Sequence, residues 1–179
     1  MAEDSLRTLA RQLDVPERTL RRAAAQGLIR GRRLSERRYK TTMREEAYLR
    51  SHWELLSGLR GALRTEPNVR LAVLFGSLAK GQGAESSDVD LLVLLRDDSA
   101  AAAAGLSGRL SKRLGRDIQV VRLADGERSP ALMLDVLADG RVLVDRDDRW
   151  RLLVEGERRW RRLAAEQGSL EDSLPDLEL

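Results

Sequence analysis

Cysteine is absent from the 179-residue chain. Its absence excludes a disulfide framework, a thiolate nucleophile and a zinc site with cysteine ligands. The one histidine, His52, lies far in sequence from the acidic motif described below, so we expect a helix-surface residue and not a catalyst. Aromatic residues make up only 3% of the chain against 42% hydrophobic residues, which predicts an aliphatic core in an α-rich or α/β protein.

Long hydrophobic runs are also missing. No stretch approaches the roughly 18 apolar residues of a membrane-spanning helix, and the N-terminus is polar and acidic. We therefore expect a soluble, cytoplasmic protein with no membrane contact. Charge, by contrast, is abundant and uneven: up to Glu66 there are 15 Lys and Arg against 9 Asp and Glu, and beyond it 17 against 20. The basic first third favours a polyanionic partner, because cations that neutralise phosphates release condensed counterions.

Apolar spacing and turn residues predict two domains and a tail. Two helices within residues 5–26, separated by Asp14-Val15-Pro16, precede a basic wing and a third helix at 43–63. The strands predicted beyond them are 69–75, 89–95, 117–123 and 141–144. The helices predicted there are 100–114, 130–139 and 147–166, with one tight helical turn at 76–81. The predicted units are a helix-turn-helix domain at 1–66, an α/β (α+β) domain with a mixed sheet flanked by helices at 67–168, and an acidic tail at 169–179.

The second helix of the first domain carries polar residues that can face solvent together. Arginine offers bidentate contacts to guanine edges, and basic residues in the wing suit flanking phosphates. The residues predicted to contact DNA are Arg18, Thr19, Arg21, Arg22, Arg32, Arg33, Arg37 and Arg38. The segment "LRTLARQLDVPERTLRRAAAQGLI" followed by "RRY" resembles the N-terminal winged helix-turn-helix of MerR-type regulators. This resemblance implies binding of double-stranded DNA, usually as a homodimer. The alternative is a three-helix bundle docked on the second domain, with its arginines in water.

The strongest chemical signal is "LFGSLAKGQGAESSDVDLLV" at residues 74–93. Gly76 lets the backbone turn closely past a ligand, Ser77 and the following amides offer donors to a phosphate, and Lys80 adds positive charge. Asp88 and Asp90, two residues apart on a strand, point to one face and can hold Mg²⁺. This chemistry suits in-line nucleotidyl transfer, in which metal ions neutralise triphosphate charge and stabilise the leaving pyrophosphate.

The same string resembles the signature of the DNA polymerase β-like nucleotidyltransferases, particularly their minimal, antitoxin-type branch. "LADGRVLVDRD" from Leu137 resembles the segment that ends such minimal domains. The resemblance implies a mixed sheet, Mg²⁺ and a nucleoside triphosphate, with ATP preferred. Many minimal members pair with a helical HEPN toxin and some transfer adenylyl groups onto it, so a toxin protein or an RNA is the implied acceptor. The residues that the resemblance assigns to the nucleotide are Gly76, Ser77, Lys80, Gly81 and Ser87, with Ser86 as an alternative to Ser87.

One position departs from the family pattern. Family members usually have a third carboxylate on the later strand, where "DIQVVRL" places Gln119. A neutral amide can orient a hydroxyl but is not an effective general base. Asp117, two residues earlier and roughly 6.6 Å away along a strand, is the alternative. Two hypotheses stay open. In the first, the protein is an active transferase with Asp88, Asp90 and either Asp117 or Gln119 as catalytic residues. In the second, the transferase fold is catalytically inactive and the protein acts as a DNA-binding regulator or antitoxin through partner binding.

Overall fold

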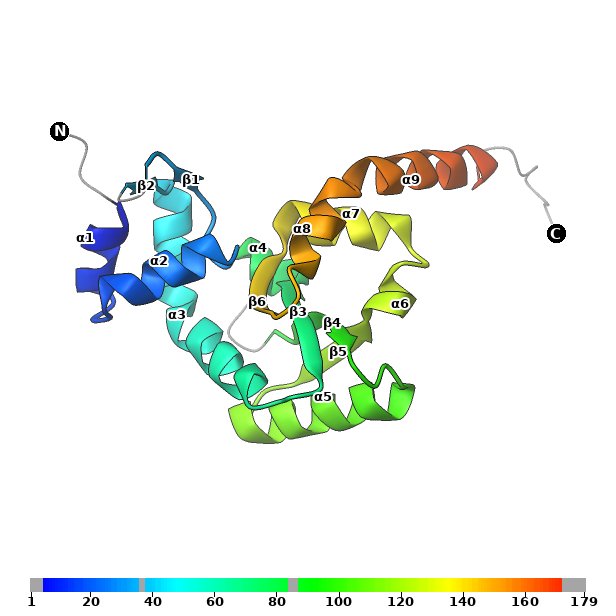
Figure 1. Cartoon of the computed structure of the whole chain (residues 1–179), viewed down its shortest axis with the longest axis horizontal. Helices are drawn as coiled ribbons and strands as arrows, with labels where there is room; N and C mark the ends of the chain where they lie inside the picture. The colour runs from blue at the N-terminus through cyan, green and yellow to red at the C-terminus, as the bar shows by residue number, and fades with distance from the viewer. Residues whose placement is uncertain (1–4, 36–37, 84–86, 172–179) are drawn as a thin grey trace.

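The computed structural model of the chain describes residues 5–35, 38–83 and 87–171. A helical part with a small hairpin leads into a part built around a sheet (Figure 1). The helices are α1 (Ser5–Gln12), α2 (Glu17–Ala25), α3 (Met43–Arg64), α4 (Gly76–Lys80), α5 (Ala100–Leu114), α6 (Leu123–Gly126), α7 (Pro130–Asp139), α8 (Arg149–Glu155) and α9 (Glu157–Glu171). The strands are β1 (Arg32–Arg33), β2 (Tyr39–Lys40), β3 (Val69–Phe75), β4 (Val89–Leu95), β5 (Ile118–Arg122) and β6 (Arg141–Asp145).

The first part contains the elements expected from the sequence, in the expected order. A short turn joins α1 to α2 and includes Asp14 in the left-handed region at φ 52°, which Asp tolerates better than most residues. Strands β1 and β2 pair antiparallel and form the predicted wing. Thr42 caps the start of α3, because its hydroxyl accepts a hydrogen bond from the Glu45 amide. The relation of this part to MerR-type regulators stays a prediction.

The second part contains a four-stranded sheet in the order β5-β4-β3-β6. Strand β3 pairs antiparallel with β4 and β6, and β4 pairs parallel with β5, so the sheet is mixed as predicted. The two central strands are nearly continuous apolar runs because both of their faces are covered. The predicted α/β fold class is confirmed.

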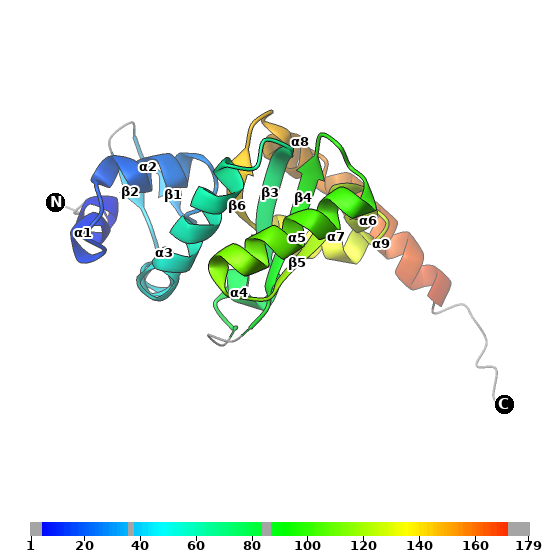
Figure 2. The same ribbon diagram turned by 90° about the horizontal axis from the view of Figure 1, so that it is seen from below.

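Helices cover both faces of the sheet. Val89, Leu91 and Val93 pack on one face in a core that includes α3 and α5, and Leu71 and Leu92 pack on the other with α6, α7 and α9. Figure 1 shows α5 on one side of the sheet and the group α7–α9 on the other, and Figure 2 shows the sheet behind α5. The first core also includes residues of α1 and α2, so the helical part shares one apolar interior with the sheet. The domain boundary after residue 66 stays a prediction.

Two details differ from the predicted elements. The single helix expected at 147–166 is interrupted at Gly156 and forms α8 and α9, because glycine is a poor helix former. The break lets Trp150 and Trp160 both pack against the second core. Helix α9 continues to Glu171, two residues into the predicted tail, and the rest of that tail lies outside the described residues. Within the described ranges no helix has the length and apolar character needed to cross a bilayer.

Candidate functional site

The end of β3 turns directly into α4 at Gly76. Gly76 has φ +74°, in the left-handed region, where glycine is favoured. A Cβ atom at this position would lie 2.5 Å from Oδ2 of Asp90. Strand pairing explains this closeness, because the preceding residue, Phe75, is the register partner of Asp90. Only glycine allows the backbone turn and the carboxylate to approach this closely.

Asp88 and Asp90 flank Val89 at the start of β4. Val89 points into the first core, so the two carboxylates share the opposite face of the strand. Asp88 is exposed and Asp90 is half-buried. Burial raises the pKa of Asp90, and the negative charge of Asp88 raises it further. Across the described residues neither carboxylate has a cationic side chain within ion-pair distance, so a bound cation would relieve the repulsion.

Gln119 completes the group on the neighbouring strand. It is the parallel register partner of Asp90, and its Nε2 donates a hydrogen bond of 3.1 Å to Oδ2 of Asp88. Asp117 lies just before β5, where its carbonyl accepts the Val89 amide at 3.0 Å and its side chain is exposed. The geometry thus joins Gln119 to Asp88 by a hydrogen bond, and the role of Asp117 at the site stays a prediction.

The remaining loop residues lie around this group. Ser77 is exposed in the first turn of α4, and its carbonyl accepts the amides of Gln82 and Gly83. Ser87 lies beside Gly83, and Arg116 donates to the Ser87 carbonyl at 2.9 Å. Arg116 was not predicted from the sequence, because a single arginine before a strand carries no motif. Ser86 lies outside the described residues.

Lys80 and Gly81 lie at the other end of α4. Gly81 ends the helix with φ +73° and contacts Tyr48, since a Cβ there would lie 3.0 Å from the ring. The Lys80 ammonium is 3.6 Å from a carboxylate oxygen of Asp135 and 3.8 Å from one of Asp139, both on α7. The structure therefore does not bring Lys80 together with the two aspartates of β4, and its role at the nucleotide stays a prediction.

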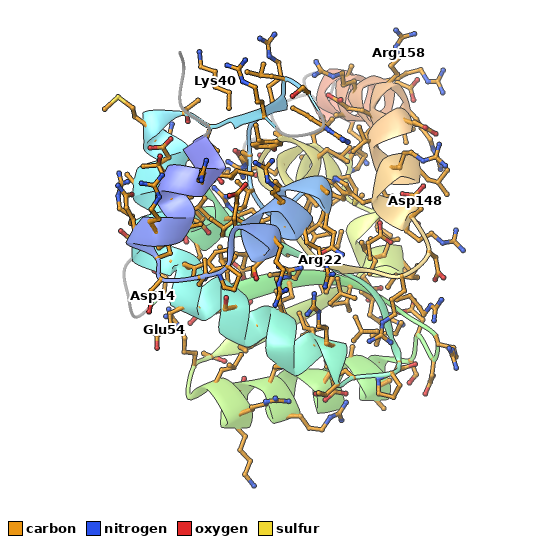
Figure 3. The ribbon with its side chains drawn as sticks, turned by 60° about the vertical axis from the view of Figure 1, so that its left-hand side comes forward. Asp14, Arg22, Lys40, Glu54, Asp148 and Arg158 are labelled. Atoms are coloured by element: carbon orange, nitrogen blue, oxygen red, sulfur yellow. The ribbon has the colours of Figure 1, made fainter. Side chains whose placement is uncertain are left out.

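The described residues among those predicted to contact DNA lie on α2 and in the wing. Arg18 and Arg22 are exposed on α2, where Figure 3 labels Arg22, and Thr19 is half-buried. Arg21 pairs with Glu17 at 2.6 Å. A groove of about 600 Å³ runs between α2 and the hairpin, and its basic wall residues are Arg21, Arg22, Arg33 and Arg38. Arg32 is exposed on β1, and Arg37 lies outside the described residues.

The donor set of the acidic group fits Mg²⁺. Two carboxylates on one strand face supply the hard oxygen ligands that this ion prefers, and Gly76 leaves room beside Asp90 that a side chain would fill. Among the residues that the structure describes, no cluster of three or more acidic or histidine side chains is found. The site thus offers two carboxylates and one amide to a metal.

Comparison with known proteins agrees with this arrangement. The family model for the polymerase beta nucleotidyltransferases matches residues 58–149, which include Gly76, both aspartates and Gln119. The chain belongs to this family. The family resemblance predicted from the glycine and aspartate motif is confirmed. The family model's match begins inside α3 and does not cover the residues before it. The DNA-binding prediction for those residues of this nucleotidyltransferase family member therefore remains untested.

Solved structures resemble this polymerase beta family member over about two thirds of its length. A toxin-antitoxin structure with AMP-PNP has 27% identity and a TM-score of 0.56, covering 65% of this chain and 95% of that chain. A variant MntA toxin-antitoxin structure has 28% identity and a TM-score of 0.53, covering 65% and 94%. A structure from Shewanella oneidensis, at 22% identity and a TM-score of 0.51 over 66% and 95%, supports the fold alone. No curated protein sequence matches the chain significantly.

Proposed function

We propose that the chain is a Mg²⁺-dependent nucleotidyltransferase of the antitoxin type, which transfers the nucleotidyl group of ATP to a HEPN-type toxin. The observation that carries the proposal is the contact between the Gly76 turn and Asp90, with Asp88 beside it on the same strand face. The AMP-PNP in one similar toxin-antitoxin structure supports a nucleotide ligand, and the toxin-antitoxin structures support a toxin as partner.

In the proposed reaction an acceptor hydroxyl oxygen bonds to the α-phosphorus of ATP, the bond from that phosphorus to the bridging oxygen breaks so that pyrophosphate leaves, and the hydroxyl proton passes to solvent water. Asp88 and Asp90 would hold Mg²⁺, which neutralises triphosphate charge when bound. Ser77 and the first amides of α4 donate to phosphate oxygens. Gln119 holds Asp88 through its amide group, and it cannot accept the proton that the acceptor hydroxyl loses. The chain therefore performs the chemistry mainly by positioning and charge stabilisation.

Binding of ATP should require both Mg²⁺ and the two aspartates. In calorimetric titration the Asp88→Asn, Asp90→Asn double variant should lose Mg²⁺-dependent ATP affinity by about 100-fold or more, which is about 2.7 kcal/mol. Asp117→Asn is the informative control, because its exposed side chain lies outside β5. Wild-type affinity in the control would show that the Asp117 carboxylate is not needed for Mg²⁺-dependent ATP binding. Equal Mg²⁺-dependent affinity in the double variant and the wild type would overturn the proposed site.

A second function, binding of double-stranded DNA, is supported by the basic groove between α2 and the wing. Its arginines come from two elements that can contact a groove and its flanking phosphates at once. In this proposal the chain is a regulator as well as a transferase, and the two activities use different residues. DNA binding should then survive the double substitution at Asp88 and Asp90.

Salt dependence tests the DNA proposal. Affinity for duplex DNA, measured by fluorescence anisotropy between about 50 and 200 mM salt, should fall steeply as counterions return. The Arg18→Ala, Arg22→Ala variant should lower the slope of log affinity against log salt by about 1.8 if both residues contact phosphates. The matched control is Arg161→Ala, Arg162→Ala on exposed α9. An unchanged slope in the α2 variant, or the same loss in the control, would contradict the proposal.

A further inference from the structure

A pocket of about 500 Å³ lies where the helical part meets the sheet part, away from the acidic group on β4. Its wall comes from the start of α3, the end of α4, the end of α7 and the first residue of β6. We call it the junction pocket. Its volume lies within the roughly 300–1,000 Å³ typical of small-molecule sites. The charged residues of its wall are Arg30, Arg44, Glu45, Lys80, Asp139 and Arg141.

The wall has an excess of positive charge. The Glu45 carboxylate is already paired, because Arg141 donates hydrogen bonds to both of its oxygens at 2.6 and 2.9 Å. Asp139 is shared between the side chains of Arg30 at 3.3 Å and Lys80 at 3.8 Å. Arg44 is exposed and has no acidic partner among the described residues. The four cations of the wall thus face two wall carboxylates, both already engaged, and Asp135 on α7, which lies 3.6 Å from the Lys80 ammonium.

The arrangement of these cations lowers the cost of binding an anion. Burial lowers the pKa of Arg30, and the positive charge of Arg141 lowers it further. Like charges therefore already repel each other at this wall. A phosphate group accepts several hydrogen bonds from arginine and lysine and removes that repulsion. His52 adds a flat surface at the rim, because its ring stacks on Tyr48 with centroids 4.3 Å apart.

We propose that the junction pocket is a second ligand site, which binds a phosphate-bearing small molecule of nucleotide size without a metal ion. Arg30 and Arg44 come from the helical part and Lys80 from the sheet part, so one ligand contacts both. This assigns Lys80 to a pocket whose lining includes neither Asp88 nor Asp90. A ligand held by both parts would add a further contact between them, beside the buried Glu45–Arg141 ion pair.

Titration in the presence of a chelator tests the second site. With EDTA present, calorimetry with ATP, AMP and inorganic phosphate should show binding of at least one of them to wild type. The Asp88→Asn, Asp90→Asn variant should bind equally well. Arg44→Glu should weaken binding at least 10-fold, and the comparison among the three probes tells a nucleotide from a free phosphate. Arg44→Glu should fold, because an acidic residue in the first turn of α3 favours the helix dipole.

The matched control is Lys112→Glu, which makes the same charge change on an exposed position of α5. It should leave the metal-free affinity within about twofold of wild type. Absence of metal-free binding for all three probes would overturn the proposal. An equal loss in Lys112→Glu and Arg44→Glu would also overturn it, because the effect would then come from net charge. Loss of metal-free binding in the aspartate variant would place the ligand at the β4 site instead.

Discussion

Glu45→Gln should lower the free energy of unfolding by about 3–5 kcal/mol, the range for breaking a buried ion pair. Glu45 and Arg141 are 5% and 2% exposed, and two hydrogen bonds join them. The substitution leaves the guanidinium buried without a counter-charge. Arg141 also lies 3.5 Å from the centroid of the Tyr48 ring, a contact that cannot replace the lost carboxylate. Thermal unfolding should shift downward by roughly 10 °C for a protein of this size.

Glu54→Gln is the control for this prediction, because Glu54 is exposed on the same helix and Figure 3 shows it at the surface. It should change stability by less than about 0.5 kcal/mol. Chemical denaturation of both variants measures the difference. If Glu45→Gln were as stable as Glu54→Gln, the ion pair would not hold the helical part on the sheet.

The same pair shows what the sequence could not reveal. Glu45 lies in the first turn of a helix and Arg141 begins a short strand, 96 residues later. Each residue alone is typical of an exposed position, and no local pattern distinguishes a buried charge from a solvated one. Apolar spacing and turn residues predicted two units along the chain, but they could not predict the shared apolar interior and the buried ion pair that join the two parts.

The acidic site was more predictable because its determinants are local. Alternation along β4 separates Asp88 and Asp90 from the buried Val89, and the glycine after β3 is part of a motif with a physical role. The sequence did not decide which residue joins Asp88 and Asp90 as the third catalytic residue, since the two candidates, Asp117 and Gln119, lie two residues apart. Register with β4 places Gln119 opposite Asp90, and Asp117 lies one residue before β5; which of the two serves as the third catalytic residue stays a prediction. A register set by pairing across a sheet cannot be derived from one strand alone.

Gln119→Asp should increase turnover by about 100-fold, the lower range for a well-placed proton acceptor. The new carboxylate would lie opposite Asp90 in the sheet and beside Asp88, the hydrogen-bond partner of Gln119. It would give the site the third carboxylate that the resemblance implies. Pyrophosphate release from ATP and Mg²⁺ with water as acceptor measures the gain without a toxin partner.

Gln119→Asn is the matched control, since asparagine has the size of aspartate without its charge. The two variants should also differ without Mg²⁺. A third negative charge raises the pKa of Asp90 beyond the rise caused by burial and by Asp88. A carboxyl group with a pKa raised in the folded state destabilises the fold once it ionises, so the aspartate variant should lose stability as pH rises through that pKa and regain it as pH falls.

Mg²⁺ should reverse this loss, because an ion bound only by the folded chain stabilises it by about 2.7 kcal/mol at 100 times its dissociation constant. Thermal unfolding with Mg²⁺ and with chelator should therefore show a larger difference in Gln119→Asp than in Gln119→Asn. Equal Mg²⁺ effects and equal pyrophosphate release in the two variants would mean that position 119 does not face the metal. A gain in Gln119→Asp over an inactive wild type would show that this single amide separates a binding module from a working transferase.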